Sequence, residues 1–136
     1  MPRGEATVAD PTIDESRDGA RVVVYGDSAP VTAQEWHCAR MVAELYRGEA
    51  LQIETVRGAW WCGRTKADGH EGRIRATRAN AVGAYTATLV GRMSDKIAEA
   101  DEWAHHAREN AHRATEQAEG HEANAARLRA ILAGAP

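Results

Sequence analysis

The sequence predicts an α+β fold in which a small head of two or three strands and one helix precedes one very long alanine-rich helix. Three observations support this prediction: a β-branched run near residue 21, a capped amphipathic segment from residue 33, and an unbroken heptad pattern over residues 86–132. A chain of 136 residues fits one domain with one modest core. We divide it into an arm (1–20), a head (21–78) and a long helix (79–136).

The arm and the first strand differ sharply in composition. Residues 1–20 hold five acids, two prolines and few large apolar side chains. Such a segment buries too little apolar surface to offset the entropy lost on ordering, so we expect a disordered or strap-like acidic arm. The run RVVVY at residues 21–25 is short and β-branched, and it predicts a strand buried on both faces.

A helix is predicted over residues 33–47. Thr32 with Glu35 three positions later forms a capping box, and Gly48 is a typical helix stop. We expect its polar stripe to face solvent; the stripe comprises His37, Arg40, Glu44 and Arg47.

The rest of the head has strand character. Residues 51–56 alternate apolar and polar side chains and predict a second strand. We expect residues 59–62 to continue it past a bulge at Gly58, since one glycine is too short for a hairpin turn. A polar loop with three glycines follows at 63–72, and residues 73–77 form the candidate returning strand.

The heptad seam predicts how the chain assembles. Most of its positions are alanine, which lets two helices approach closely, and its bulky residues are nearly symmetric about Ala111. We therefore expect an antiparallel coiled coil between two or more copies, with Val90 facing Leu132. The alternative is that the helix lies in a groove of its own chain. The predicted seam residues are Val90, Met93, Ile97, Ala104, Ala107, Ala111, Ala114, Ala118, Leu128 and Leu132.

Charge and cysteine content limit the possible partners. The formal net charge of −3 is small, so bulk charge predicts neither nucleic acid nor membrane. No apolar run approaches the roughly 20 residues that span a bilayer, so we expect no membrane partner. The cysteines, Cys38 and Cys62, lack metal-ligand spacing, which favours a reducing cytoplasm or a virion interior.

Positive charge is concentrated in one segment. Residues 57–78 hold six cations and two acids, with two adjacent tryptophans and a glycine-rich loop. Aromatic side chains beside arginines can stack bases and bind phosphates, and glycine lets backbone amides approach an anion. The alternative is that the tryptophans anchor a core or interface and the arginines pair with acids of the long helix. The candidate ligand-binding residues are Arg57, Trp60, Trp61, Arg64, Lys66, Arg73, Arg75 and Arg78.

Two further patterns bear on metal binding and catalysis. Glu102-x-x-His105 and Glu109-x-x-His112 have the local spacing of di-metal helix bundles, but they fall outside the seam. We therefore expect a solvated face there, with no metal and no cofactor.

The segment Tyr25-Gly26-Asp27-Ser28 resembles the first block of GDS-type (SGNH) ester hydrolases. The resemblance implies Ser28 as a nucleophile. The family's glycine and asparagine blocks and its Asp-x-x-His element are absent from the sequence. A turn that ends the first strand accounts for Gly26 and Asp27.

The function predicted from these patterns is a non-enzymatic, homo-oligomeric binding or assembly protein. Its basic Trp/Arg hairpin would bind an anionic partner, either nucleic acid or a nucleotide. The alternative is a purely structural oligomer, such as a phage or mobile-element component, that holds no ligand.

Overall fold

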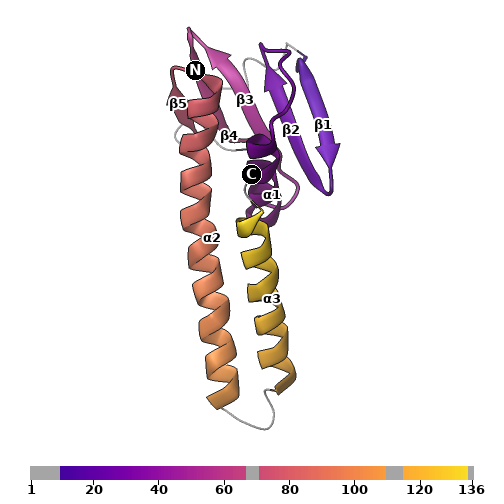
Figure 1. Cartoon of the computed structure of the whole chain (residues 1–136), viewed down its shortest axis with the longest axis vertical. Coiled ribbons are helices and arrows are strands. Elements are labelled where there is room, and N and C mark those ends of the chain that lie inside the picture. Colours follow the sequence, from indigo (N-terminus) through magenta and orange to yellow (C-terminus); the bar gives the residue numbers. More distant parts are fainter. Residues whose placement is uncertain (1–9, 67–70, 110–114, 135–136) are drawn as a thin grey trace.

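The computed structural model describes residues 10–66, 71–109 and 115–134, and it confirms the α+β class. Within these residues, one five-stranded sheet is accompanied by three helices (Figure 1). Five strands replace the two or three that the sequence predicted. In chain order the elements are β1 (Ile13–Arg17), β2 (Ala20–Tyr25), α1 (Ala33–Leu45), β3 (Leu51–Val56), β4 (Ala59–Arg64), β5 (Arg73–Arg75), α2 (Arg78–Glu109) and α3 (Thr115–Ala133).

The strands follow one another across the sheet in the order β1-β2-β3-β4-β5. Only β2 and β3 run parallel, because α1 carries the chain back between them; the other neighbours are antiparallel. This order places β1 and β5 at the two edges. Strand β2, which lies between β1 and β3, has Val22, Val23 and Val24 all buried, which confirms a strand covered on both faces.

Two tight turns explain why the sheet has more strands than predicted. Asp18 and Gly19 join β1 to β2, Arg57 and Gly58 join β3 to β4, and all four residues have positive φ. Two-residue turns of this kind match the twist of antiparallel strands. The predicted bulge at Gly58 is therefore wrong: Arg57 supplies the second turn residue, and β4 returns beside β3.

Strand β1 also changes the description of the N-terminal arm. Residues 13–17 pair along their length with β2, so a disordered or strap-like arm does not describe them. Asp14 and Arg21 support the pairing through two hydrogen bonds of 2.8 Å. Residues 1–9 lie outside the described part of the chain.

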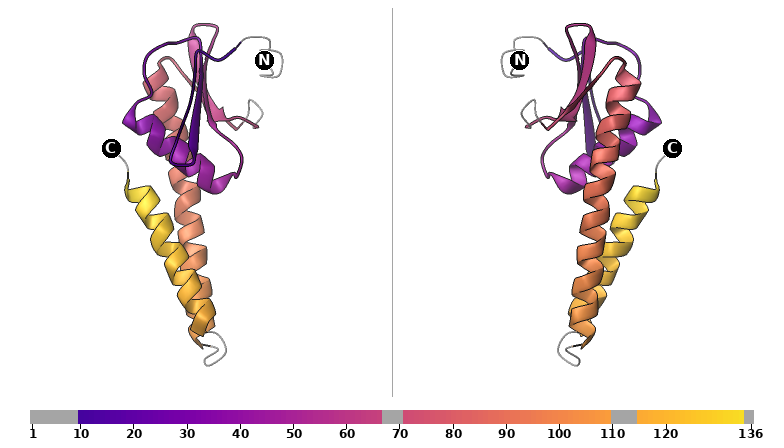
Figure 2. Two further views of the ribbon diagram at one scale, coloured as in Figure 1. Left: turned by 90° about the vertical axis from the view of Figure 1, so that its right-hand side faces the viewer. Right: turned by 90° about the vertical axis from the view of Figure 1, so that its left-hand side faces the viewer.

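The core lies between one face of the sheet and the helices α1 and α2 (Figure 2). Strand side chains alternate, so one set from β2, β3 and β4 points toward the helices. Each fully buried aliphatic side chain contributes about 1.5–3 kcal/mol. This set and the helical residues that meet it include Val22, Val24, Leu51, Ile53, Cys62, Cys38, Met41, Val42, Val82, Tyr85 and Leu89.

Helix α1 begins as the sequence predicts. The hydroxyl of Thr32 accepts from the backbone N–H of Glu35, and the Glu35 carboxylate accepts from the N–H of Thr32, each at 3.1 Å. The predicted solvent-facing stripe is wrong at His37, which is buried. Burial, together with the nearby charge of Arg40, lowers the pKa of His37.

The predicted continuous helix is two helices. α2 ends at Glu109, α3 begins at Thr115, and the two pack side by side in opposite directions (Figure 1). The seam of α2 thus has a partner within its own chain, as in the intramolecular alternative. Buried seam positions are Met93, Ile97, Ala100, Ala104, Ala107, Ala118, Ala125 and Leu128.

The ends of the seam meet the core. Val90 and Leu132 are half-buried against the core cluster. Ala111 and Ala114 lie outside the described residues. In the described part of the chain, no helix is long and apolar enough to cross a bilayer.

Candidate anion-binding edge

The structure divides the eight predicted ligand-binding residues into two groups. Some are buried or already paired, and others are exposed or half-buried around β4 and the edge strand β5. The first group must be identified before the second can be considered as a site.

Arg64 is held at the end of β4 by two carboxylates. Its guanidinium donates to both oxygens of Glu49, at 2.9 and 2.8 Å, and also to Glu71. The group also lies over the ring of Tyr46, 4.3 Å from its centroid. Because only 16% of its side chain is exposed, Arg64 fixes the β4 end of the loop and has little capacity left for an external anion.

Arg78 is similarly engaged at the start of α2. Its guanidinium pairs with both oxygens of buried Glu35, at 2.9 and 2.8 Å, and with Asp27 at 3.0 Å. A fourth bond goes to the carbonyl of Ala29. These contacts join the starts of α1 and α2 to the turn after β2, so Arg78 is part of the scaffold.

The contacts of Arg78 also explain the structure of the segment that resembles a hydrolase block. One carboxylate oxygen of Asp27 accepts from the N–H of Ala29, and the other accepts from Arg78. The hydrogen bond from Ala29, followed by that from Arg78, holds the pKa of Asp27 below its usual value. Asp27 therefore closes a turn, while Ser28 is exposed beside it.

The two tryptophans point to opposite faces of β4. Trp60 is half-buried against the core, whereas Trp61 is 2% exposed on the face away from the helices. The Trp61 ring lies against the backbone of Gly63 and Gly72, where a Cβ would meet it. A base from outside cannot stack on a ring that is already covered, so Trp61 acts as an anchor.

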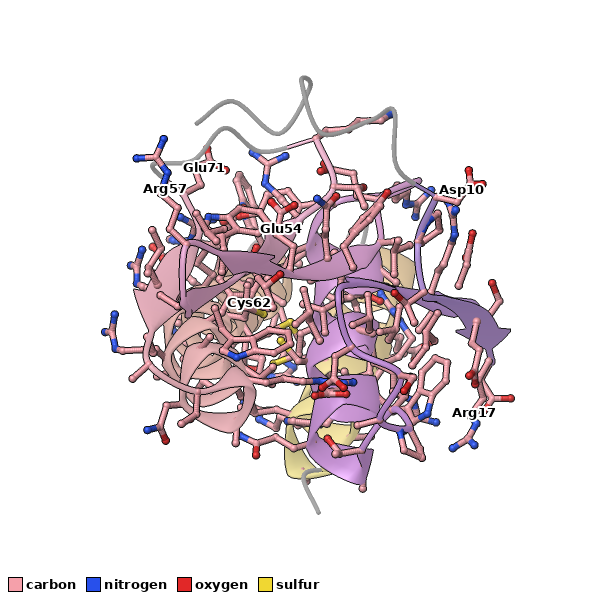
Figure 3. The ribbon with its side chains drawn as sticks, turned by 90° about the horizontal axis from the view of Figure 1, so that it is seen from above. Asp10, Arg17, Glu54, Arg57, Cys62 and Glu71 are labelled. Carbon is pink, nitrogen blue, oxygen red and sulfur yellow. The ribbon has the colours of Figure 1, made fainter. Side chains whose placement is uncertain are left out.

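Four cations remain, and together they form what we call the cationic edge: Arg57, Lys66, Arg73 and Arg75. Arg57 lies in the β3–β4 turn and is exposed, as Figure 3 shows from above. Arg73 and Arg75 donate to the backbone carbonyls of Gly72 and Ile74. Within the described residues, none of the four side-chain cations pairs with a carboxylate within 4 Å, although the backbone N–H of Lys66 donates to the carboxylate of Glu49 at 3.0 Å.

The cationic edge is long and narrow. Arg73 and Arg75 are two positions apart on β5, and so about 7 Å apart along one face of the strand. Arg57 and Lys66 flank opposite ends of β4, roughly 25 Å apart. This spacing suits an extended anion with repeated charges better than a single phosphate group.

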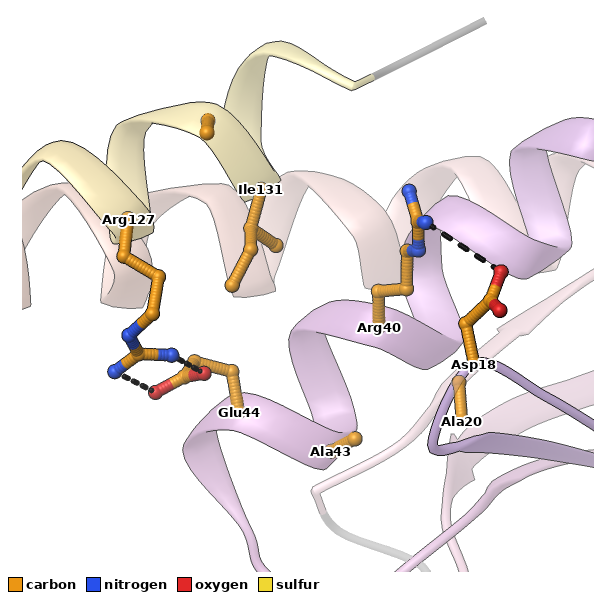
Figure 4. A pocket seen from close by; sticks show the side chains of 8 residues that line it. Asp18, Ala20, Arg40, Ala43, Glu44, Arg127 and Ile131 are labelled. Carbon is orange, nitrogen blue, oxygen red and sulfur yellow. Dashed lines mark hydrogen bonds and ion pairs between the residues drawn. The ribbon is translucent and has the colours of Figure 1, made fainter.

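A groove of about 430 Å³ lies elsewhere, between α1 and the end of α3 (Figure 4). Its two arginines already have acidic partners: Arg40 pairs with Asp18 at 3.8 Å, and Arg127 binds both carboxylate oxygens of Glu44. The groove thus balances its own charge. It is a weaker anion site than the cationic edge.

The structure offers little for catalysis or metal binding in its described part. Cys38 and Cys62 are free but buried, and burial raises the pKa of the Cys62 thiol, which disfavours the reactive thiolate. His105 pairs with Glu109 at 3.2 Å on the exposed side of α2. Among residues 10–66, 71–109 and 115–134, no three His, Cys, Asp or Glu side chains lie where they could hold a metal.

Trp103, to which no sequence motif assigns a role, is 56% exposed on α2. Its ring stacks on His121 of α3, with centroids 6.4 Å apart. Only the pairing of α2 with α3 brings these residues together, so no local pattern predicts the contact.

Comparisons with models of known protein families, with curated proteins and with solved structures find no match for this chain.

Proposed function

We propose that the chain is a non-enzymatic binding protein whose cationic edge binds a polyanion, with nucleic acid as the partner. The observation that carries the proposal is that, within the described residues, no carboxylate pairs with the side-chain cations of Arg57, Lys66, Arg73 and Arg75, which lie around β4 and the edge strand β5. Arg64 and Arg78, whose charges are neutralised by acids, hold that edge in place.

The spacing of the cations favours nucleic acid over a mononucleotide. The phosphates of one nucleotide are clustered, whereas the four side chains extend over roughly 25 Å. A nucleic acid strand presents one charge about every 3.4 Å and can contact all four. Since Trp61 is covered, these contacts go to the phosphate backbone, and we expect binding with little sequence preference.

The test is fluorescence anisotropy with labelled 30-nucleotide single strands and duplexes over a range of KCl concentrations. Four phosphate contacts predict that log K falls against log salt with a slope of about −3 for single strands and about −3.6 for duplexes. Arg73→Ala with Arg75→Ala should roughly halve that slope and weaken binding to every sequence equally.

A charge-matched control separates the edge from bulk charge. Arg17→Ala with Arg47→Ala removes the same charge from exposed positions on β1 and after α1. Figure 3 shows Arg17 across the sheet from Arg57. The control should bind as the unmodified chain does. Equal losses in both double variants, or no binding by the unmodified chain at low salt, would contradict the proposal.

A further inference from the structure

Cys38 and Cys62 form a pair of thiols inside the core. Cys38 lies on α1 and Cys62 on β4, and both side chains belong to the buried cluster between the sheet and the helices. Figure 3 shows Cys62 on the helix side of its strand. The two thiols hydrogen bond to each other, although they are distant in the sequence. The packing of α1 on the sheet therefore brings together two groups that one covalent bond could join.

Polar groups surround the thiol pair. The hydroxyl of Tyr85, on α2, lies near both thiols, and Tyr85 is only 1% exposed. No residue in the described part of the chain hydrogen bonds to this hydroxyl. An unpartnered buried hydroxyl is unfavourable, and it can donate a hydrogen bond to a thiol sulfur that loses its proton.

We propose that Cys38 and Cys62 are a modification site, at which hydrogen peroxide converts the two thiols into a disulfide that joins α1 to β4. One thiol attacks the peroxide as its thiolate, the O–O bond breaks, and a sulfenic acid and water form. The second thiol then displaces the hydroxyl group from that sulfur as the S–S bond forms, and a second water leaves. The two sulfurs lose two electrons in total, the peroxide gains them, and both thiol protons end in water.

Burial determines the rate and the product of this reaction. Neither thiol is exposed, and burial raises the pKa of the Cys62 thiol, so attack on peroxide requires a local opening of the core. Once the core closes again, the second thiol is in contact with the sulfenic sulfur, whereas further peroxide is excluded. We therefore expect slow oxidation that stops at the disulfide. This inference does not depend on nucleic acid binding, because neither cysteine belongs to the cationic edge.

The disulfide would stabilise the fold. It closes a loop of about 25 residues that contains β3, and such a bond reduces the conformational entropy of the unfolded chain. For a chain of this size we expect Tm to rise by roughly 5–10 °C.

Peptide mapping tests the proposal on the folded full-length chain. After treatment with a series of hydrogen peroxide concentrations, free thiols are blocked in denaturant and the chain is cleaved with trypsin. The disulfide links peptides 22–40 and 58–64, which separate on reduction. Cys38→Ala and Cys62→Ala are the matched controls, because each keeps one thiol and every other oxidisable side chain.

The proposal is supported by linked peptides from a monomeric chain whose near-UV circular dichroism is unchanged and whose Tm rises. Dithiothreitol should reverse that rise, and neither control should show it. Two thiols that stay free at the highest peroxide concentration that leaves the chain folded would overturn the proposal. Thiols lost only as sulfinic or sulfonic acids, or only as links between chains, would also overturn it.

The melting measurement provides a second check. Linked peptides from a chain whose Tm is unchanged or lower overturn the proposal, because the native fold then does not accommodate the bond. An equal rise in Tm in either control overturns it as well, since the rise would then come from oxidation elsewhere in the chain.

Discussion

The indole ring of Trp61 requires glycine at two separate positions, 63 and 72, because a Cβ at either one would meet the ring. Gly63 follows it on β4 and Gly72 comes before β5, and the ring covers both. Neither has the positive φ that elsewhere favours glycine, so the requirement is for space rather than backbone conformation. Gly72 can lie beside Gly63 and the Trp61 ring because these two glycines lack side chains.

We therefore predict that Gly72→Ala lowers the free energy of unfolding by about 1–3 kcal/mol, as is usual when a buried site is overpacked. The control is Gly91→Ala on α2, where an added Cβ meets nothing within 4 Å. That change should raise the free energy of unfolding by about 0.5–1 kcal/mol, since glycine weakens a helix interior. Urea unfolding of both variants measures the two changes in the free energy of unfolding. A neutral or stabilising Gly72→Ala would contradict the account of Trp61.

At the scale of elements, Glu44 links all three helices. It lies on α1, pairs with Arg127 of α3 and lies 3.7 Å from Lys96 of α2. The hydrogen bonds from Arg127 hold the pKa of Glu44 below its ordinary value of 4.5. This contact positions the end of α3 against α1, and it is a tertiary contact between residues 83 positions apart.

The lowered pKa of Glu44 determines the direction in which the free energy of unfolding changes with pH. A carboxylate whose folded pKa is lowered stabilises the protein above its unfolded pKa, and that contribution is lost as pH falls through the folded value. Glu44→Gln should therefore cost up to about 1 kcal/mol near pH 6, because the pair is partly exposed. The cost should shrink below pH 4.5 and vanish in stronger acid.

Unfolding at a series of pH values checks this prediction, with Glu99→Gln at an exposed position of α2 as the control. The control should show no comparable pH-dependent difference. A cost for Glu44→Gln that stays constant from pH 6 to pH 3 would contradict the role of its ionised form.

At the scale of the whole molecule, packing is uneven along the long axis. Near the sheet, α2 buries Val82, Tyr85, Leu89 and Met93 against strands and α1. Further along, its buried contacts are mainly alanines facing α3. Since alanine buries little area, the far end of the helical hairpin has less apolar stabilisation per residue than the end that meets the sheet.

Hydrogen exchange should reveal this gradient. We expect backbone amides of β2, β3 and the first half of α2 to exchange only through global unfolding. Amides of residues 98–109 should exchange at least about tenfold faster through local opening. Labelling the intact folded chain and then measuring its peptides by mass spectrometry gives the exchange rates of both sets of amides. Uniform protection along α2 would show that the alanine contacts are as stabilising as the core.

Much of the fold could be predicted from local patterns. The capping box at Thr32, the strand at 51–56 and the ends of the long helical region were readable because each depends on nearby residues. Strand β1 was missed although Asp18-Gly19 is a hairpin signal. The Arg57-Gly58 turn was harder to predict, since arginine uncommonly adopts positive φ.

The candidate site was only partly predictable. Composition identified the basic segment, but it could not show which arginines meet acids. Glu49 and Glu35 reach Arg64 and Arg78 only after β3 and β4 pair and α2 packs on the sheet. The cationic edge consists of the cations of this segment that do not take part in these ion pairs.

The sequence by itself determined the α+β class and the capped first helix, and it predicted which face of α2 is buried, because all of these follow from spacing along the chain. The tertiary structure decided that the seam meets α3 of the same chain, that Trp61 and His37 are buried, and which cations remain unpaired in the described residues. The physical reason is that a periodic pattern defines the face that a helix buries. It contains no information on which surface, in this chain or another, will cover that face.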